Sequence, residues 1–143
     1  MKNKMKQPQN PRDMKPFELW TAQLPVEKGG SLKCGRRPVV VVSEETYGSL
    51  PHVSVVPLTR DLSSLQLPTH VLLCSRFLDS PSRALCEQVM TLEKSRLIRR
   101  IGYVEDAFDR FALRRALAVH LNLTSVQELG IQENSLYTPL CAV

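Results

Sequence analysis

The 143-residue sequence has no apolar run longer than five residues, such as Pro38–Val42. A membrane-spanning helix needs about 20 apolar residues, so no transmembrane segment is expected. No apolar stretch follows the basic N-terminal residues, so a secretory signal peptide is not expected either. These two absences predict a cytoplasmic protein.

Cysteine and histidine are few and scattered. The histidines lie far apart at positions 52, 70 and 120, and no Cys-x-x-Cys pair occurs. Neither residue has the spacing of a zinc site, so we expect no metal and no cofactor. In a reducing cytoplasm the cysteines are expected to be free thiols, with two of them, Cys74 and Cys86, as small core residues. The four cysteines are Cys34, Cys74, Cys86 and Cys141.

A glycine-rich phosphate loop after a strand is also missing, as is a Gly-x-Ser-x-Gly nucleophile motif. The composition of 43% hydrophobic and 23% charged residues is that of one packed domain. The net charge is +5, but residues 1–16 carry +4 of it. We therefore predict a disordered basic leader at 1–16, a folded domain at 17–123 and a partly disordered extension at 124–143. The basic excess permits a nucleic-acid partner without establishing one.

Alternating or β-branched segments predict most of the domain to be β-strand. Proline cannot donate to a ladder, so Pro38 is expected only at the start of its strand and Pro57 at a bulge or edge. A glycine-containing loop is expected at Pro25–Gly35 and a polar loop at Arg60–Gln66. The expected strands are Phe17–Leu24, Arg37–Ser43, His52–Thr59, Thr69–Cys74, Ala84–Leu92 and Arg99–Val104.

The hydrophobic period changes after Asp106. Apolar residues then recur at three- and four-residue steps, which predicts one helix ending near Asn122. Its expected apolar face is Phe108, Phe111, Ala112, Ala116, Val119 and Leu123. A further turn of helix is expected at Ser125–Glu128. Many short strands followed by one long helix indicate a mainly β (α+β) fold, a small barrel of bent antiparallel strands with a C-terminal helix.

Several short motifs occur in a fixed order along this pattern, and together they resemble the MazF/PemK family of bacterial toxin ribonucleases over about residues 17–123. The motifs are Glu18-Leu19-Trp20, Gly30-Ser31, Arg37-Pro38-Val39-Val40-Val41-Val42, Val56-Pro57-Leu58-Thr59, Leu67-Pro68-Thr69-His70-Val71, Cys86-Glu87-Gln88, Thr91-Leu92-Glu93-Lys94-Ser95-Arg96-Leu97 and Arg100-Ile101-Gly102. The resemblance implies an SH3-like barrel, a homodimer and metal-independent, sequence-specific cleavage of single-stranded RNA through a 2′,3′-cyclic phosphate. It also implies a cognate antitoxin, MazE-like, that blocks the RNA groove.

The resemblance assigns catalysis to Arg37 and Thr59, with Ser31 close to the phosphate. The planar guanidinium of Arg37 suits phosphate oxygens, and the following Pro38 restricts its backbone to extended conformations. Ser31 is otherwise a flexible-loop serine. The family usually continues with a glutamate where this chain has Leu32, so an acidic role in this loop is not expected.

The motif Cys86-Glu87-Gln88 supplies secondary catalytic or RNA-contact candidates. Glu87 matches an acid that some members use as a base beside an arginine, but Leu85 occupies the arginine's position. Glu87 otherwise ties down Arg99 or Arg100. Gln88 is expected either to read a base edge or to form a hydrogen bond with the backbone.

Two further side chains have a functional and a structural interpretation. His70 is either a general base or part of the scaffold. Trp20 either stacks on a base or belongs to the core.

Basic side chains form two runs, at 28–37 and 94–100, that would attract RNA phosphates if the fold brought them together. The RNA-binding candidates are Lys28, Lys33, Arg36, Arg60, Lys94 and Arg96. The alternative is two unrelated solvated loops.

Two other functions stay open from the sequence. One is that the chain is a non-catalytic family member that only binds RNA or an antitoxin, because Leu32 stands where the family usually has a glutamate. A CcdB-like gyrase inhibitor is the other, although that family has a tryptophan near its C-terminus and residues 137–143 contain none.

Overall fold

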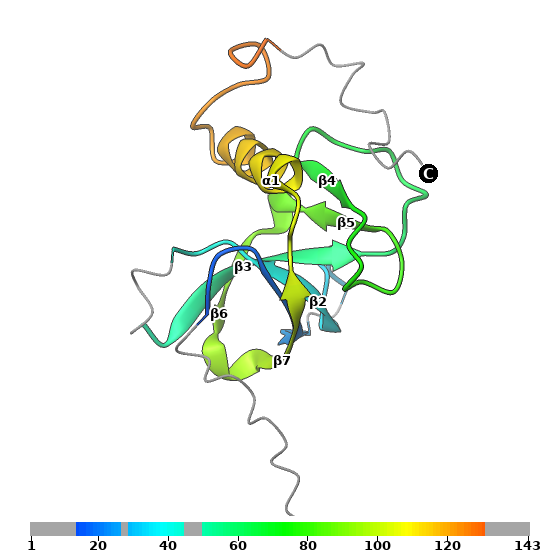
Figure 1. Ribbon diagram of the computed structural model, residues 1–143, viewed down its shortest axis with the longest axis vertical. Coiled ribbons are helices and arrows are strands. Elements are labelled where there is room, and N and C mark those ends of the chain that lie inside the picture. Colours follow the sequence, from blue (N-terminus) through cyan, green and yellow to red (C-terminus); the bar gives the residue numbers. More distant parts are fainter. Residues whose placement is uncertain (1–13, 27–28, 45–49, 131–143) are drawn as a thin grey trace, which may run out of the picture.

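The computed structural model describes residues 14–26, 29–44 and 50–130. Its strands form one antiparallel sheet in the order β4-β5-β3-β2-β1-β7, with β6 also pairing with β3. The sheet is strongly bent, and helix α1 lies over the side where β4 and β5 are found (Figure 1). The elements in chain order are β1 Glu18–Leu24, β2 Gly35–Val41, β3 His52–Thr59, β4 His70–Leu73, β5 Ser82–Leu85, 3₁₀ turn η3 Cys86–Gln88, β6 Met90–Glu93, 3₁₀ turn η4 Lys94–Arg96, β7 Leu97–Tyr103 and α1 Ala107–His120.

The sheet separates two hydrophobic cores, because successive side chains of a strand point to opposite faces. The helix-side core contains Leu19, Val40, Val56 and Leu58 together with buried residues of α1. The second core lies on the other face and is built around Trp20, which is 1% exposed. Each fully buried large apolar side chain contributes about 1.5–3 kcal/mol. Trp20 is therefore a core residue, and the alternative in which it stacks on a base is wrong.

The expected fold class is confirmed, with bent antiparallel strands and a C-terminal helix, although in the described residues the sheet is open and not closed into a full barrel. One expected strand is wrong, because Ala84–Leu92 is interrupted by η3 between β5 and β6. The Cys86 amide donates to the Thr69 carbonyl at 3.0 Å, and the Val89 amide then donates to the Cys86 carbonyl at 3.2 Å. These bonds turn the chain at Cys86, so β5 and β6 pair with different parts of β3.

Both strand prolines lie inside the sheet. Pro38 is the fourth residue of β2 and pairs with Thr21, so its expected place at the strand start is wrong. Pro57 lies in a central strand and not at an edge, but β3 changes partner there. Its pairs with β6 end at Val55 and those with β5 begin at Leu58. Proline is tolerated where no ladder bond is required.

Helix α1 begins after Asp106, whose carboxylate accepts from the Phe108 amide at 2.8 Å as an N-cap. The expected buried face of the helix is only partly right, because Phe108 and Phe111 are 83% and 58% exposed. The buried residues of α1 are Ala112, Leu113 and Ala116. Beyond the helix, Ser125 and Glu128 exchange hydrogen bonds as a capping box around a single turn.

The expectation of four free thiols is wrong for Cys74. Cys34 and Cys86 are free, whereas Cys74 is disulfide-bonded. Cys74 is also exposed, so its expected place in the core is wrong. Cys86 is a core residue as expected, and burial raises the pKa of its thiol to about 12. Cys141 lies outside the described residues.

Candidate active site

Arg37, Thr59 and Arg83 lie side by side on three neighbouring strands. Thr59 of β3 pairs with Arg83 of β5. The antiparallel pairing of β2 and β3 ends at Val39 with Pro57. Arg37 and Thr59 each lie two residues beyond this pair, so they stand opposite each other. The Arg37 side chain crosses to β3, where Nη1 donates to the Leu58 carbonyl at 3.2 Å. We call Arg37, Thr59 and Arg83 the polar row.

The polar row lies on the sheet face away from α1. Arg37 alternates in phase with Val39 and Val41, which belong to the second core. Thr59 is likewise in phase with Val53 and Val55 of that core. The sheet thus continues from an apolar core into a row of polar side chains at the ends of β2 and β3.

Two hydrogen bonds to backbone carbonyls fix the half-buried Arg37 guanidinium. Nε donates to the Cys34 carbonyl at 3.1 Å, and Nη1 donates to Leu58. An arginine has five N–H donors, so three remain for a ligand when only its partners among the described residues are counted. Gly35 precedes this position at φ +74°, a left-handed conformation that glycine adopts without strain.

Thr59 is 9% exposed, and its hydroxyl oxygen accepts from the Asp61 amide at 3.2 Å. Because that lone pair is occupied by an N–H, the hydroxyl proton points elsewhere and can be donated to a phosphate oxygen. The Asp61 carboxylate accepts from the amide and hydroxyl of Ser63, and these bonds, with Lys33 and Arg83 nearby, lower its pKa.

The 29–34 loop, which leads into β2, carries Ser31 and Leu32 in exposed positions. Gln88 holds this loop, since its Oε1 accepts from the Lys33 amide at 2.7 Å. Gln88 had two interpretations, and the structure shows the second, a hydrogen bond with the backbone.

Glu87 and His70 form a separate network beside η3. Glu87 accepts from the Thr69 hydroxyl and lies 2.9 Å from His70 Nε2, so its expected link to Arg99 or Arg100 is wrong. His70 Nδ1 accepts from the Leu67 amide at 3.1 Å, which leaves the proton of the neutral ring on Nε2. Both ring nitrogens are thus occupied and the side chain is 6% exposed. His70 therefore belongs to the scaffold.

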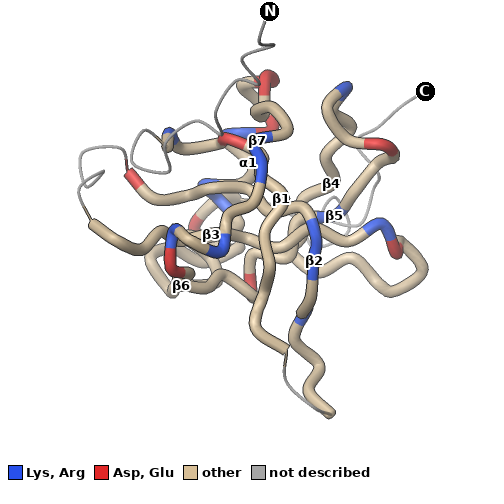
Figure 2. Tube along the Cα trace, turned by 90° about the horizontal axis from the view of Figure 1, so that it is seen from below, with Lys and Arg blue, Asp and Glu red and all other residues tan. Residues whose placement is uncertain are grey.

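The two basic runs do not form one patch, and Figure 2 shows Lys and Arg dispersed among acidic segments. Arg36 and Arg37 point to opposite faces of β2. Lys94 is 8% exposed, so the expectation that it offers its charge at the surface is wrong. Arg100 pairs with Glu18.

Some basic candidates remain accessible. Arg36 pairs with Gln23, whose carbonyl accepts from Arg96 Nη1 at 3.3 Å, so these two exposed arginines flank Gln23. Arg60 is exposed directly after Thr59, and Lys33 is half-buried. Lys28 lies outside the described residues.

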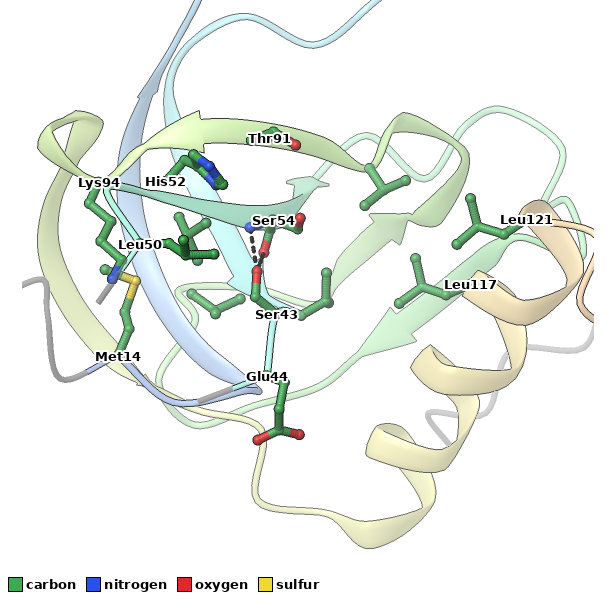
Figure 3. A pocket seen from close by; sticks show the side chains of 14 residues that line it. Met14, Ser43, Glu44, Leu50, His52, Ser54, Thr91, Lys94, Leu117 and Leu121 are labelled. Carbon is green, nitrogen blue, oxygen red and sulfur yellow. Dashed lines mark hydrogen bonds between the residues drawn. The ribbon is translucent and has the colours of Figure 1, made fainter. Parts of the chain in front are cut away.

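A cavity of about 450 Å³ lies at the opposite ends of β2 and β3. It is mostly apolar, with Lys94 at one end and, at the other, Leu117 of α1 and Leu121 just after that helix (Figure 3). Its lining includes Val41 and His52, which are the far ends of the two strands that carry Arg37 and Thr59. The cavity and the polar row are therefore separate features.

Arg83 and Asp61 are the site residues that sequence reasoning missed. The structure itself is what reveals Arg83, as a charged residue in the strand Ser82–Leu85, every residue of which is buried. Within the described ranges, no three His, Cys, Asp or Glu side chains are placed to hold a metal ion. No helix in those ranges is long and apolar enough to cross a membrane.

Comparison with known proteins identifies the family. Residues 15–121 match the model of the PemK-like, MazF-like toxins of type II toxin–antitoxin systems. Because this match covers most of the chain, the protein belongs to that family. A curated relative, "Endoribonuclease MazF" of Staphylococcus saprophyticus, is 36% identical over 97 residues, which are 65% of this chain and 79% of the relative.

Solved structures agree with this assignment. The Mycobacterium tuberculosis toxin MazF-mt6 superimposes with a TM-score of 0.61 at 28% identity, covering 75% of this chain and 98% of that one. A mycobacterial endoribonuclease solved with its cognate antitoxin has the same fold, with a TM-score of 0.62 at 21% identity, covering 78% and 97% of the two chains.

Proposed function

We propose that this toxin is a metal-independent endoribonuclease that cuts single-stranded RNA at a short sequence. The observation that carries the proposal is the polar row, which places the unused donors of a half-buried arginine beside a threonine hydroxyl. The named activity of the staphylococcal relative supports the reaction class.

In the proposed reaction the 2′-oxygen of the nucleotide before the scissile bond attacks phosphorus, and the bond to the 5′-oxygen breaks. The 2′-hydroxyl loses its proton and the departing 5′-oxygen gains one, leaving a 2′,3′-cyclic phosphate and a 5′-hydroxyl. Charge accumulates on the non-bridging oxygens of the phosphorane. Arg37 stabilises that charge through its remaining N–H donors, and Thr59 adds its hydroxyl proton.

The other candidates take supporting roles in this proposal. Ser31 contacts the phosphate from the 29–34 loop, and Gln88 holds that loop through Lys33. Glu87 positions Thr69 and His70, because both of its carboxylate oxygens are engaged there. Arg36, Arg60 and Arg96 are exposed and attract the RNA backbone.

We further propose that the chain acts in the cytoplasm as a homodimer, with the folded unit at 17–123. Its proposed partner is a cognate antitoxin that covers the RNA groove. The related mycobacterial structure with its cognate antitoxin supports such a partner.

The test is cleavage of a mixed-sequence single-stranded RNA by purified protein in excess EDTA. The proposal requires cutting in EDTA, a cyclic phosphate on the product and loss of cutting in Arg37→Ala with unchanged circular dichroism. A strict requirement for a divalent metal would contradict it. Binding of the RNA without any cutting would instead identify a non-catalytic binding protein.

A further inference from the structure

Arg83 is a buried cation that the proposed reaction does not use. The residue is 5% exposed in β5, and no acidic side chain among the described residues forms an ion pair with it within 4 Å. A buried charge is costly unless hydrogen bonds compensate it. Its partners therefore indicate what the charge is used for.

The partners of Arg83 are all in the loop formed by residues 60–66. Nη1 donates to the Ser64 carbonyl at 2.9 Å and to the Ser64 hydroxyl at 3.2 Å, and Nη2 donates to the Leu62 carbonyl at 3.4 Å. Two of these acceptors are backbone carbonyls, so the guanidinium fixes the path of the loop. A planar fork can bridge two carbonyls in a way that a lysine ammonium cannot.

This loop carries the group that orients Thr59. The Asp61 amide donates to the Thr59 hydroxyl oxygen, and Asp61 immediately precedes Leu62, whose carbonyl Arg83 holds. Thr59 and Arg83 are also paired in the sheet. The two ends of this arrangement, Thr59 and Arg83, are therefore linked both by the strand pairing and through the loop.

We propose that Arg83 is a positioning residue, which holds the 60–66 loop so that the Asp61 amide orients the Thr59 hydroxyl toward the scissile phosphate. This inference rests on the proposed function for its catalytic consequence, but the loop clamp itself does not depend on catalysis. Arg83 acts through Thr59 and does not contact RNA. The pKa of the exposed Asp61 carboxylate is lowered mainly by its hydrogen bonds from Ser63, and Arg83 has the smallest share in that shift.

The test uses Arg83→Gln, with Arg76→Gln as the matched control for loss of one positive charge. Arg76 is 70% exposed and pairs with Glu105, away from the polar row. In Arg83→Gln we expect the Asp61 and Ser63 amides, which both donate hydrogen bonds within this part of the chain, to exchange with deuterium about tenfold faster or more, because the loop opens locally. Single-turnover cleavage at saturating protein should fall about 10²-fold, the scale expected for a misplaced catalytic group. The control should change neither quantity.

Binding of a 2′-O-methyl RNA separates positioning from direct contact. A side chain that neutralises one phosphate of a single strand contributes about 0.7 to the slope of log affinity against log salt. Arg83→Gln should leave that slope and the affinity unchanged. A slope reduced by about 0.7 would mean that Arg83 touches phosphate, and it would overturn the proposal.

Unchanged deuterium exchange at Asp61 would also overturn it, as would normal cleavage in a variant whose loop has opened. Failure of the wild-type protein to cut RNA would refute the proposed function instead, and the exchange experiment would still decide whether the clamp exists. If Arg83→Gln does not fold, Arg83→Lys keeps the charge without the fork. We expect it to show the same faster exchange and slower cleavage with unchanged RNA binding, and wild-type values would overturn the proposal.

Discussion

The two ends of strands β2 and β3 differ sharply. One end holds a cavity of about 450 Å³ with mainly apolar walls, the size and character of a small-molecule pocket. The other end has Arg37, Thr59 and Arg83 in one row, each fixed by bonds to loop backbone. Phosphoryl chemistry depends on positioned donors and not on enclosed volume. The comparison therefore supports the polar end as the proposed active site.

Arg37→Ala should give the largest effect. Loss of a guanidinium that stabilises transferring phosphoryl charge costs about 10³–10⁵-fold in rate. We expect cleavage of single-stranded RNA to fall by that order in a single-turnover assay. The matched change at the cavity end, Leu121→Ala, should stay within about twofold of wild type because it removes no donor. Equal losses in the two variants would contradict the assignment of the site.

Thr59→Ala should give the next largest effect. Removing one donor from an oxyanion site costs about 10²–10³-fold in kcat. Thr59→Ser keeps the hydroxyl that accepts from the Asp61 amide, so it should retain most of the activity. The measurement is kcat for one RNA oligonucleotide with all three proteins. If serine were as inactive as alanine, the hydroxyl would not be the acting group.

Substitution of the exposed arginines should change binding more than catalysis. Arg36→Gln and Arg60→Gln should each lower the slope of log affinity against log salt by about 0.7, because each removes one of the proposed phosphate contacts of an exposed arginine. Lys94→Gln, at the cavity end, should leave that slope unchanged since the residue is buried. Titration of a fluorescent 2′-O-methyl RNA at several salt concentrations measures all three. A lower slope in Lys94→Gln would show that its charge reaches the RNA.

The smallest expected effect concerns Cys34 and Cys86, the free thiols of the part of the chain that the structure describes. Burial raises the pKa of Cys86 to about 12, so its thiol stays protonated at pH 8 and should resist iodoacetamide. Cys34 is half-buried in the loop before Arg37 and should be alkylated. An unfolded thiol ionises near pH 9, so stability contributed by the protonated Cys86 should decline as the pH rises from 9 toward 12. Peptide mass mapping and urea titrations at pH 8 and 10 test these statements. Alkylation of Cys86 in the folded protein would refute its burial.

Much of the fold was accessible from the sequence because it depends on local patterns. His52–Thr59 alternates as a strand and is β3, and the change of period at Asp106 marks the start of α1. The break at Cys86 could not be predicted, because a hydrogen bond to Thr69, distant in sequence, makes it. Periodicity alone also placed Phe108 on the buried face, although the sheet covers the face that carries Leu113.

The candidate site divides in the same way. Arg37 and Thr59 were nominated by short motifs, and the β2–β3 register brings them together. Arg83 was missed because its importance lies in carbonyls about twenty residues away, to which no residue type gives a clue. Lys94 was misjudged because a lysine in a charged segment is usually solvated, whereas here the fold covers it.

The most direct test of attack by the 2′-hydroxyl uses one RNA oligonucleotide that carries a single cleavage site. The nucleotide before the scissile bond is replaced by its 2′-deoxy form, and both oligonucleotides are incubated with wild-type protein in EDTA. The account predicts cleavage of the all-RNA strand to a 2′,3′-cyclic phosphate and no cleavage at the substituted bond. Cleavage of the substituted strand at the same bond would contradict it.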